Sequence, residues 1–181
     1  MTWTIDSSHS TIGFSARHMV FTKVRGIFAT FSGEVELDPA APEKGSARFA
    51  IETASVATRD EKRDGHLRSA DFFDVEKYPR ITFKSTGVTP KGGIRYAVRG
   101  DLTIHGTTKP VVLDVELSGV QKSHWGANVA ALTATTTIDR RDWGLVWNVA
   151  LEAGGLLVSE KVDLDIELEL VEQAAAASTA A

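Results

Sequence analysis

Residues 162–170 read VDLDIELEL, so apolar side chains alternate with acids along the whole stretch. A β-strand places neighbouring side chains on opposite faces, whereas a helix brings side chains back to one face about every 3.6 residues. This stretch therefore predicts one long strand, with Val162, Leu164 and Leu170 facing a core. The intervening acids are expected to form a solvated exterior.

The same period of two recurs along most of the chain and indicates eight or nine strands. Turn-forming residues separate these runs, as in TPKGG at residues 89–93 and at Gly106. One-sided alternation and hairpin-like spacing favour an antiparallel sheet closed into a barrel, with a β-sandwich as the alternative. The other alternating runs lie within residues 12–18, 27–37, 47–51, 81–83, 94–98, 111–117 and 130–138.

Residues 58–69 (TRDEKRDGHLRS) lack this period and predict one short helix. Thr58 and Glu61 have the spacing of a capping box, in which side chains satisfy the free N–H groups at a helix start. Gly65 lowers helix stability by about 1 kcal/mol relative to alanine, which favours a brief helix. The DFFD sequence at residues 71–74 then predicts a loop that tucks both aromatic rings against the barrel.

The composition excludes several classes of protein. The chain has 181 residues, of which 43% are hydrophobic and 24% charged, and this fits one globular domain. It contains no cysteine, which excludes disulfides, thiol nucleophiles and Cys-ligated zinc. Its net charge of −4 argues against a general nucleic-acid-binding protein.

The ends of the chain bear on domain bounds and location. We expect a barrel domain over residues 1–171 and a disordered Ala-rich tail over residues 172–181. No stretch approaches the roughly 18 apolar residues of a spanning helix, and the start, MTWTID, lacks the basic and apolar regions of a signal peptide. These features predict a cytoplasmic protein.

Several longer motifs resemble the YceI-like family, over about Trp3 to Leu170. The resemblance implies a lipocalin-like antiparallel β-barrel whose elongated apolar interior holds a polyisoprenoid chain, often in a dimer and without catalysis. Many members carry a secretory signal, which is absent here, and Trp143 stands where the family usually has phenylalanine. The motifs are IDSSHS (5–10), FSARH (14–18), RGIFATFSG (25–33), RDEKRDGHLRSADFFDVEKYP (59–79) and DLTIHG (101–106).

Aromatic residues are the candidate lining of this interior, although aromatic alternation by itself equally describes an ordinary core. His18 shares the parity of Phe14, so it is either a core histidine bonded to a backbone carbonyl or a polar contact at one end of the tunnel. Phe28 and Phe31 have opposite parity, so both face inward only if a β-bulge separates them. The candidate cavity residues are Phe14, His18, Phe28, Phe31, Phe49, Phe72, Phe73, Phe83, Trp143 and Trp147.

A local excess of positive charge suggests where a lipid head group could bind. No acid lies between Asp6 and Glu34, although three cations do. They form either a solvated strand face or a rim that holds an anionic head group outside the barrel mouth, where arginine can bind it bidentately. The candidate rim residues are Arg17, Lys23 and Arg25, joined by Arg59, Arg63 and His66.

Enzymatic functions have less support. None of the five histidines has another at the three- to five-residue spacing typical of zinc sites, and there is no Gly-x-Ser-x-Gly nucleophile elbow or phosphate-binding glycine loop. We therefore expect a protein without metal or cofactor that binds and sequesters or carries a polyisoprenoid or similar amphiphilic lipid. The alternatives are a filled barrel acting as an interaction or stress-response protein, and a metal-assisted enzyme.

Overall fold

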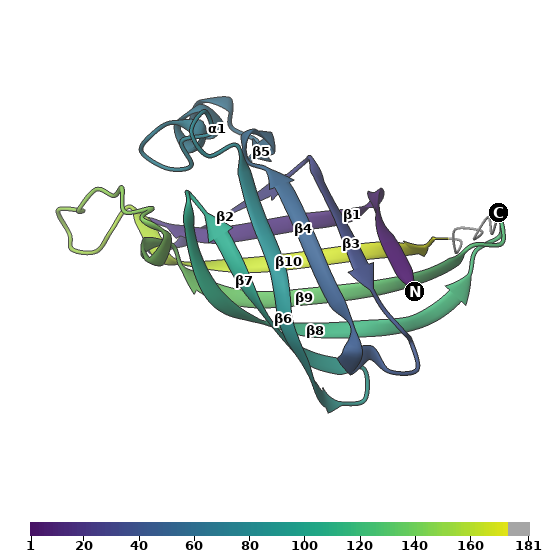
Figure 1. Ribbon diagram of the computed structural model, residues 1–181. Coiled ribbons are helices and arrows are strands. Elements are labelled where there is room, and N and C mark those ends of the chain that lie inside the picture. The colour runs from purple at the N-terminus through teal and green to yellow at the C-terminus, as the bar shows by residue number, and fades with distance from the viewer. Residues whose placement is uncertain (174–181) are drawn as a thin grey trace.

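The computed structural model describes residues 1–173, and their strands form one antiparallel sheet that closes into a barrel (Figure 1). The strands are β1 (Thr2–His18), β2 (Thr22–Phe28), β3 (Phe31–Glu36), β4 (Ser46–Glu52), β5 (Val56–Ala57), β6 (Arg80–Gly92), β7 (Arg95–Ile104), β8 (Thr107–Lys122), β9 (Asn128–Asp139) and β10 (Val158–Glu172). Their order in the sheet is β10-β9-β8-β7-β6-β4-β3-β1-β2-β5, and β10 also pairs with β1. This pairing closes eight strands and leaves β2 and β5 as an extension beside β1. The predicted antiparallel barrel is confirmed, and the β-sandwich alternative is wrong.

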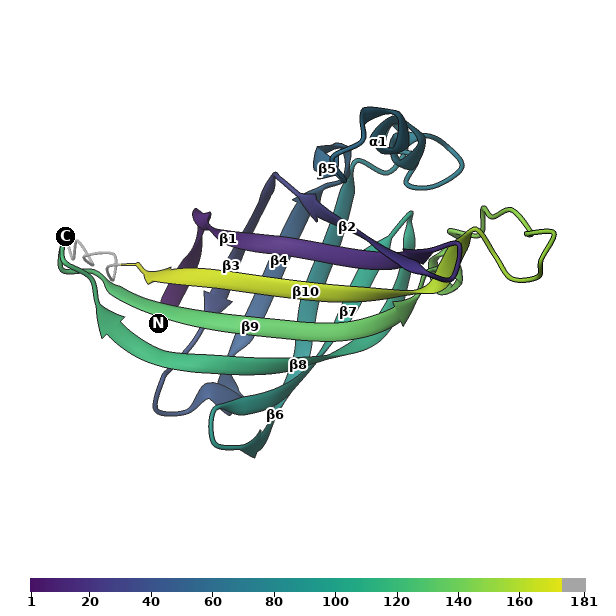
Figure 2. The same ribbon diagram turned by 180° about the vertical axis from the view of Figure 1, so that it is seen from behind.

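β1 takes part in three ladders, because β10 lies along one side of it and its two halves have different partners on the other side. Residues 2–4 pair with β3, and residues 12–18 pair with β2. β10 runs beside both halves of β1 (Figure 2). The register between β1 and β10 shifts between Asp6 and Thr11. The alternating stretch at residues 162–170 forms the middle of β10, where Leu168 and Leu170 are buried and Glu167 is exposed.

The run predicted over residues 27–37 is broken into β2 and β3, rather than bulged. The backbone N–H groups of Ala29 and Thr30 donate to the carbonyl and the hydroxyl of Ser55, which draws these two residues out of the ladder. Phe28 is therefore 7% exposed and Ile27 44% exposed. The alternation over residues 27–37 predicts that Ile27 faces the core together with Phe31, and this is wrong for Ile27 because the break changes which parity points inward.

One α-helix, α1 (Glu61–Arg68), follows β5 within the described residues, as predicted. Its N-cap is Asp60, whose carboxylate accepts the N–H of Arg63 at 3.0 Å, so the predicted capping box is wrong. The Thr58 hydroxyl donates instead to the buried carboxylate of Asp64 at 2.6 Å. Three short 3-10 helices complete the described chain: η1 (Pro42–Lys44), η2 (Thr53–Ser55) and η3 (Arg140–Trp143).

The loop after α1 brings Phe72 and Phe73 against the barrel, as predicted. Phe72 is buried, and the Phe73 ring lies 5.7 Å from that of Phe28.

At the other end of the chain, Glu172 still belongs to β10 and pairs with Trp3, so the strand includes the first residue assigned to the tail. Residues 174–181 of that predicted tail lie outside the described residues. Within residues 1–173, every helix is too short or too polar to span a membrane.

Candidate functional site

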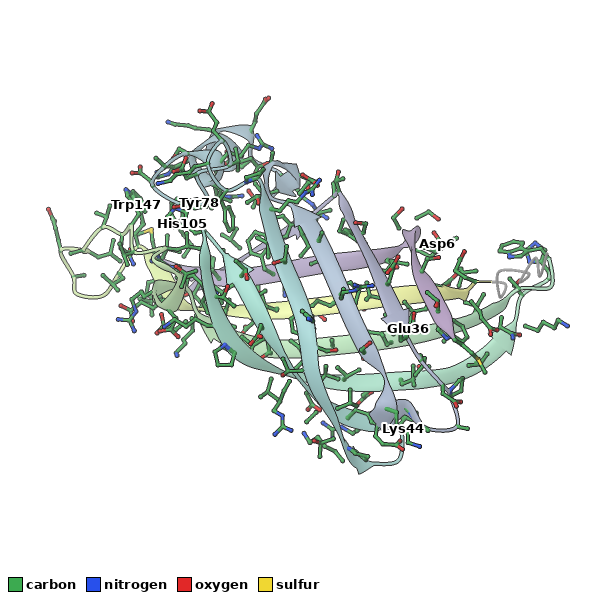
Figure 3. The ribbon with its side chains drawn as sticks, viewed as in Figure 1. Asp6, Glu36, Lys44, Tyr78, His105 and Trp147 are labelled. Atoms are coloured by element: carbon green, nitrogen blue, oxygen red, sulfur yellow. The ribbon has the colours of Figure 1, made fainter. Side chains whose placement is uncertain are left out.

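The interior of the barrel holds a cavity of about 250 Å³ with an almost wholly apolar wall. Phe72, Phe73 and Leu67 line it beside α1, whereas Leu37 and Pro42 line it beside η1. Figure 3 shows Glu36 and Lys44 at the end of the barrel away from Trp147 and α1. The cavity thus extends between two ends of the barrel that differ in their covering elements.

Aromatic rings in the wall fit over glycines of the neighbouring strands. A Cβ atom on Gly26 would lie 2.4 Å from the ring of Phe14, its partner across β1 and β2. A Cβ atom on Gly33 would lie 2.2 Å from the ring of Phe49, its partner across β3 and β4. Since real atoms do not approach so closely, any other residue at either glycine would push the ring further into the cavity.

Part of the predicted aromatic set lines the cavity. The residues that do so are Phe14, Phe28, Phe49, Phe72, Phe73 and Phe83, and those that do not are His18, Phe31, Trp143 and Trp147. That the lining residues contact a ligand stays a prediction.

The predicted residues outside the wall have other neighbours. Trp143 is buried in the core, where its indole N–H donates to the Leu102 carbonyl at 3.0 Å. The Trp147 ring packs 4.6 Å from that of His66. Phe31 packs against the core at the start of β3. His18 is half-buried at the end of β1, where it pairs with Thr22 of β2. Both roles expected for it, a core histidine or a polar contact at the tunnel end, stay predictions.

Sequence reasoning missed the aliphatic part of the wall and one charged residue in it. The missed aliphatic residues come mainly from the alternating runs of β8, β9 and β10, which were used to predict the fold but not the site. The charged residue is Arg140, at the start of η3. The aliphatic residues include Leu113, Val115, Leu132, Ala134, Ile138, Leu164, Ile166 and Leu168.

The predicted cationic rim does not line the cavity. Lys23 lies on the outer wall, where its ammonium bonds to Asp163 at 2.9 Å and lowers the pKa of that carboxyl. Arg25 and Lys23 both line a hollow on the outer wall of the barrel, and Arg17 is exposed. These strand positions follow the outward parity of β1 and β2, which is why they miss the interior.

The cations of the α1 segment are mostly engaged by protein acceptors. The guanidinium of Arg63 donates to the hydroxyl and the carbonyl of Thr58 at 2.7 and 2.8 Å. His66 Nε2 lies 2.8 Å from a carboxylate oxygen of Asp71. Arg59 is exposed. That these cations hold an anionic head group outside the barrel mouth stays a prediction.

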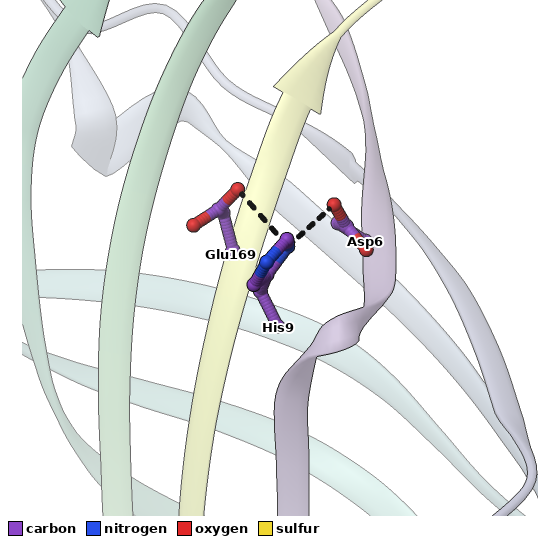
Figure 4. Close-up of side chains that lie close together, drawn as sticks. All are labelled: Asp6, His9 and Glu169. Carbon is purple, nitrogen blue, oxygen red and sulfur yellow. Dashed lines mark hydrogen bonds and ion pairs between the residues drawn. The ribbon is translucent and has the colours of Figure 1, made fainter. Parts of the chain in front are cut away.

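A polar cluster on the surface brings Asp6 and His9, near the N-terminus, close to Glu169 of β10 (Figure 4). His9 Nδ1 lies 3.0 Å from Asp6 Oδ2 and 3.8 Å from Glu169 Oε1. Hydrogen bonds from Ser8 and His9 lower the pKa of Asp6 to about 2, and the bond to Asp6 raises the pKa of His9. Two carboxylates and an imidazole are metal-ligand types, but these side chains are at the surface and already bond to one another. The expectation of a protein without metal stays a prediction.

Comparison with known proteins places this geometry in a family. The YceI-like domain model matches residues 3–170. A UPF0312 protein of Vibrio cholerae is 36% identical over 166 residues, which cover 92% of this chain and 84% of that protein. A UPF0312 protein of Pseudomonas putida is 36% identical over 168 residues, covering 93% and 84% of the two chains.

Solved structures agree with this assignment. The crystal structure of Burkholderia cenocepacia BcnA has a TM-score of 0.79 at 26% identity and covers 91% of this chain and 98% of that one. The Campylobacter jejuni YceI protein has a TM-score of 0.77 at 31% identity and covers 87% and 90%. A polyisoprenoid binding domain from Saccharophagus degradans shares the fold, with a TM-score of 0.69 at 19% identity, covering 94% and 98%. The family match, the sequence identities and the shared barrel together show that this chain belongs to the YceI-like family.

Proposed function

We propose that this protein binds and sequesters or carries a polyisoprenoid or similar amphiphilic lipid inside the barrel, without catalysing a reaction. The observation that carries the proposal is the apolar cavity between the α1 and η1 ends. Each CH₂ group buried there contributes about 0.8 kcal/mol, so one five-carbon isoprene unit contributes about 3 to 4 kcal/mol before ordering costs.

The size of the cavity favours one slender chain. Its volume of about 250 Å³ is close to the lower end of the roughly 300 to 1,000 Å³ of small-molecule sites. A barrel of about eight strands has room for a single small ligand only where its side chains leave space. The name of the Saccharophagus degradans domain supports the proposal at the level of the fold, because the same architecture is described there as polyisoprenoid binding.

The direct test is to extract the purified protein with organic solvent, identify any lipid by mass spectrometry, and then titrate the delipidated protein with farnesol. We expect a retained lipid and saturable farnesol binding. If the protein retains no lipid and does not bind farnesol, the filled barrel without a ligand is favoured. Metal analysis of the same sample tests the metal-assisted enzyme.

A matched pair of β9 variants locates the binding inside the barrel. Ala134 is buried and lines the cavity, whereas Ala131 is exposed on the other face of the same strand. Ala134→Leu should weaken farnesol binding by filling the cavity, and its thermal transition shows whether the apo protein accommodates the added volume. Ala131→Leu should bind farnesol as the wild type does. Equal binding by both variants would place the ligand elsewhere. Dimer formation and a cytoplasmic location stay predictions.

A further inference from the structure

The cavity wall contains one deeply buried charge. Arg140 is 5% exposed and lines the cavity beside Leu145 and Val158. Its guanidinium carbon lies 6.0 Å from the centre of the Phe72 ring, which lines the same end. The side chain therefore places a cation in surroundings that are otherwise apolar.

The protein provides hydrogen-bond acceptors for only some of the N–H groups of this guanidinium. Nε donates to the Ser159 carbonyl at 3.0 Å, Nη1 donates to the Leu145 carbonyl, and Nη2 lies 3.5 Å from the Val158 carbonyl. These bonds join the two ends of the loop between η3 and β10. A guanidinium has five N–H groups, so these three bonds leave two N–H groups for another acceptor.

The charge itself also has no counter-ion in contact. Within residues 1–173, no carboxylate lies within 4.0 Å of the Arg140 guanidinium, and its three acceptors are neutral carbonyls. The neighbouring acids, Asp139 and Glu160, bond instead to Arg141 at 2.7 and 2.9 Å. Removing a cation from water without a paired anion is unfavourable, and burial accordingly lowers the pKa of Arg140.

The opposite end of the cavity offers no comparable charge. Glu36 lies there between the buried Val35 and Leu37, so its own side chain faces outward and is exposed. Its carboxylate accepts the Thr2 hydroxyl at 2.6 Å and lies 3.8 Å from the N-terminal ammonium. Arg140 is therefore the one cation in the described wall of the cavity, and it favours an anionic head group at the end beside Phe72.

We infer that Arg140 receives the polar end of the bound lipid, that this end is a monoanionic acid such as a carboxylate, and that the chain extends toward the η1 end of the cavity. The inference rests on the proposed lipid-binding function. One cation neutralises one negative charge and can donate its free N–H groups to the two oxygens of a carboxylate. A diphosphate would bring further negative charge into an apolar cavity with no second cation in its described wall.

The test compares farnesoic acid, farnesol and farnesyl diphosphate, which share one chain and differ in the head group. The wild-type protein should bind farnesoic acid at pH 7 on the order of tenfold more tightly than farnesol, as expected for one net charge-assisted contact. Farnesyl diphosphate should bind more weakly than farnesoic acid. Because the contact is buried, the acid preference should persist at high salt, unlike a preference that arises from surface charges.

Three variants assign the preference to Arg140. Arg140→Gln should lose the preference for the acid, so that farnesoic acid and farnesol bind with similar affinity. Arg140→Lys should retain part of the preference because the charge remains. Arg141→Gln is the matched control, since Arg141 is the adjacent cation and bonds to acids outside the cavity wall. It should keep the wild-type preference.

The possible failures are distinguishable. If the wild type binds no prenyl ligand, the proposed function fails. If it binds farnesol and farnesoic acid equally, or the diphosphate most tightly, the inference about Arg140 fails and the lipid-binding function stands. An acid preference that survives in Arg140→Gln overturns the residue assignment. If that variant does not fold, the order of the three ligands on the wild type and on Arg140→Lys decides the question.

Discussion

The two faces of β9 and β10 carry opposite chemistry, although they belong to the same strands. The inward face presents Ala134 and Leu164 to the cavity. On the outward face, the carboxylate of Asp163 accepts hydrogen bonds from the Thr137 hydroxyl and the Lys23 ammonium. Exposed ion pairs contribute little to stability, because water screens and competes for them. The comparison teaches that stability depends mainly on the inner face, which is also the face that the proposed lipid would contact. The following predictions test that difference.

The largest effect is expected from a charge placed on the inner face of β10. Leu170 is 0% exposed, so Leu170→Asp would bury an unpaired carboxylate at a cost of about 4 kcal/mol or more. This is a large share of the roughly 5 to 15 kcal/mol that stabilises a typical domain, so circular dichroism should show a lost or greatly lowered thermal transition. Glu167→Gln, on the outer face of the same strand, should unfold at the wild-type temperature. A well-folded Leu170→Asp protein would contradict the assigned core.

A second pair of variants tests the register of β2. Phe28→Ala should destabilise the protein by about 3 to 5 kcal/mol, because it leaves a cavity between the rings of Phe14 and Phe73. Ile27→Ala should cost less than about 1 kcal/mol, because that side chain is largely exposed. Urea unfolding measures both. The reverse order would mean that Ile27, rather than Phe28, points inward.

The helix cap offers a smaller effect on the outer surface. Asp60→Ala removes the acceptor for the Arg63 N–H and should lower the melting temperature by about 2 to 4 °C. Glu61→Ala should change it by less than about 1 °C, since that carboxylate caps nothing in the structure. Equal losses in the two variants would favour the capping box that the sequence suggests.

The smallest effect concerns the exposed cluster of Asp6, His9 and Glu169. Asp6 has a lowered pKa of about 2, so its contribution is present above its unfolded pKa of 3.8 and is lost as the pH falls toward 2. His9 has a raised pKa, so its contribution is present below its unfolded pKa of 6.5 and is lost as the pH rises through the folded pKa. The wild type should therefore melt above His9→Gln at pH 5, and the difference should shrink above neutral pH. A difference that is constant from pH 5 to pH 9 would exclude the ion pair as its cause.

The sequence predicted the architecture better than the site. A period of two can be recognised within a single strand, as in residues 111–117, 130–138 and 162–170. It therefore predicted both the β-fold and which side chains turn inward. It failed at Ile27, where the break between β2 and β3 changes the parity. Such irregularities depend on contacts with distant residues, as the bonds from Ala29 and Thr30 to Ser55 show.

By itself, the sequence determined an antiparallel β-fold, one helix near residue 61, and the inward loop of Phe72 and Phe73, because these follow from local periodicity and turn chemistry. Only the tertiary structure decided that Arg140 lies buried in the wall of the cavity beside Phe72. It also decided that Asp6 and His9 meet Glu169, because barrel closure pairs β1 with β10. Closure of the barrel brings together residues from opposite ends of the chain, and no local pattern encodes that pairing.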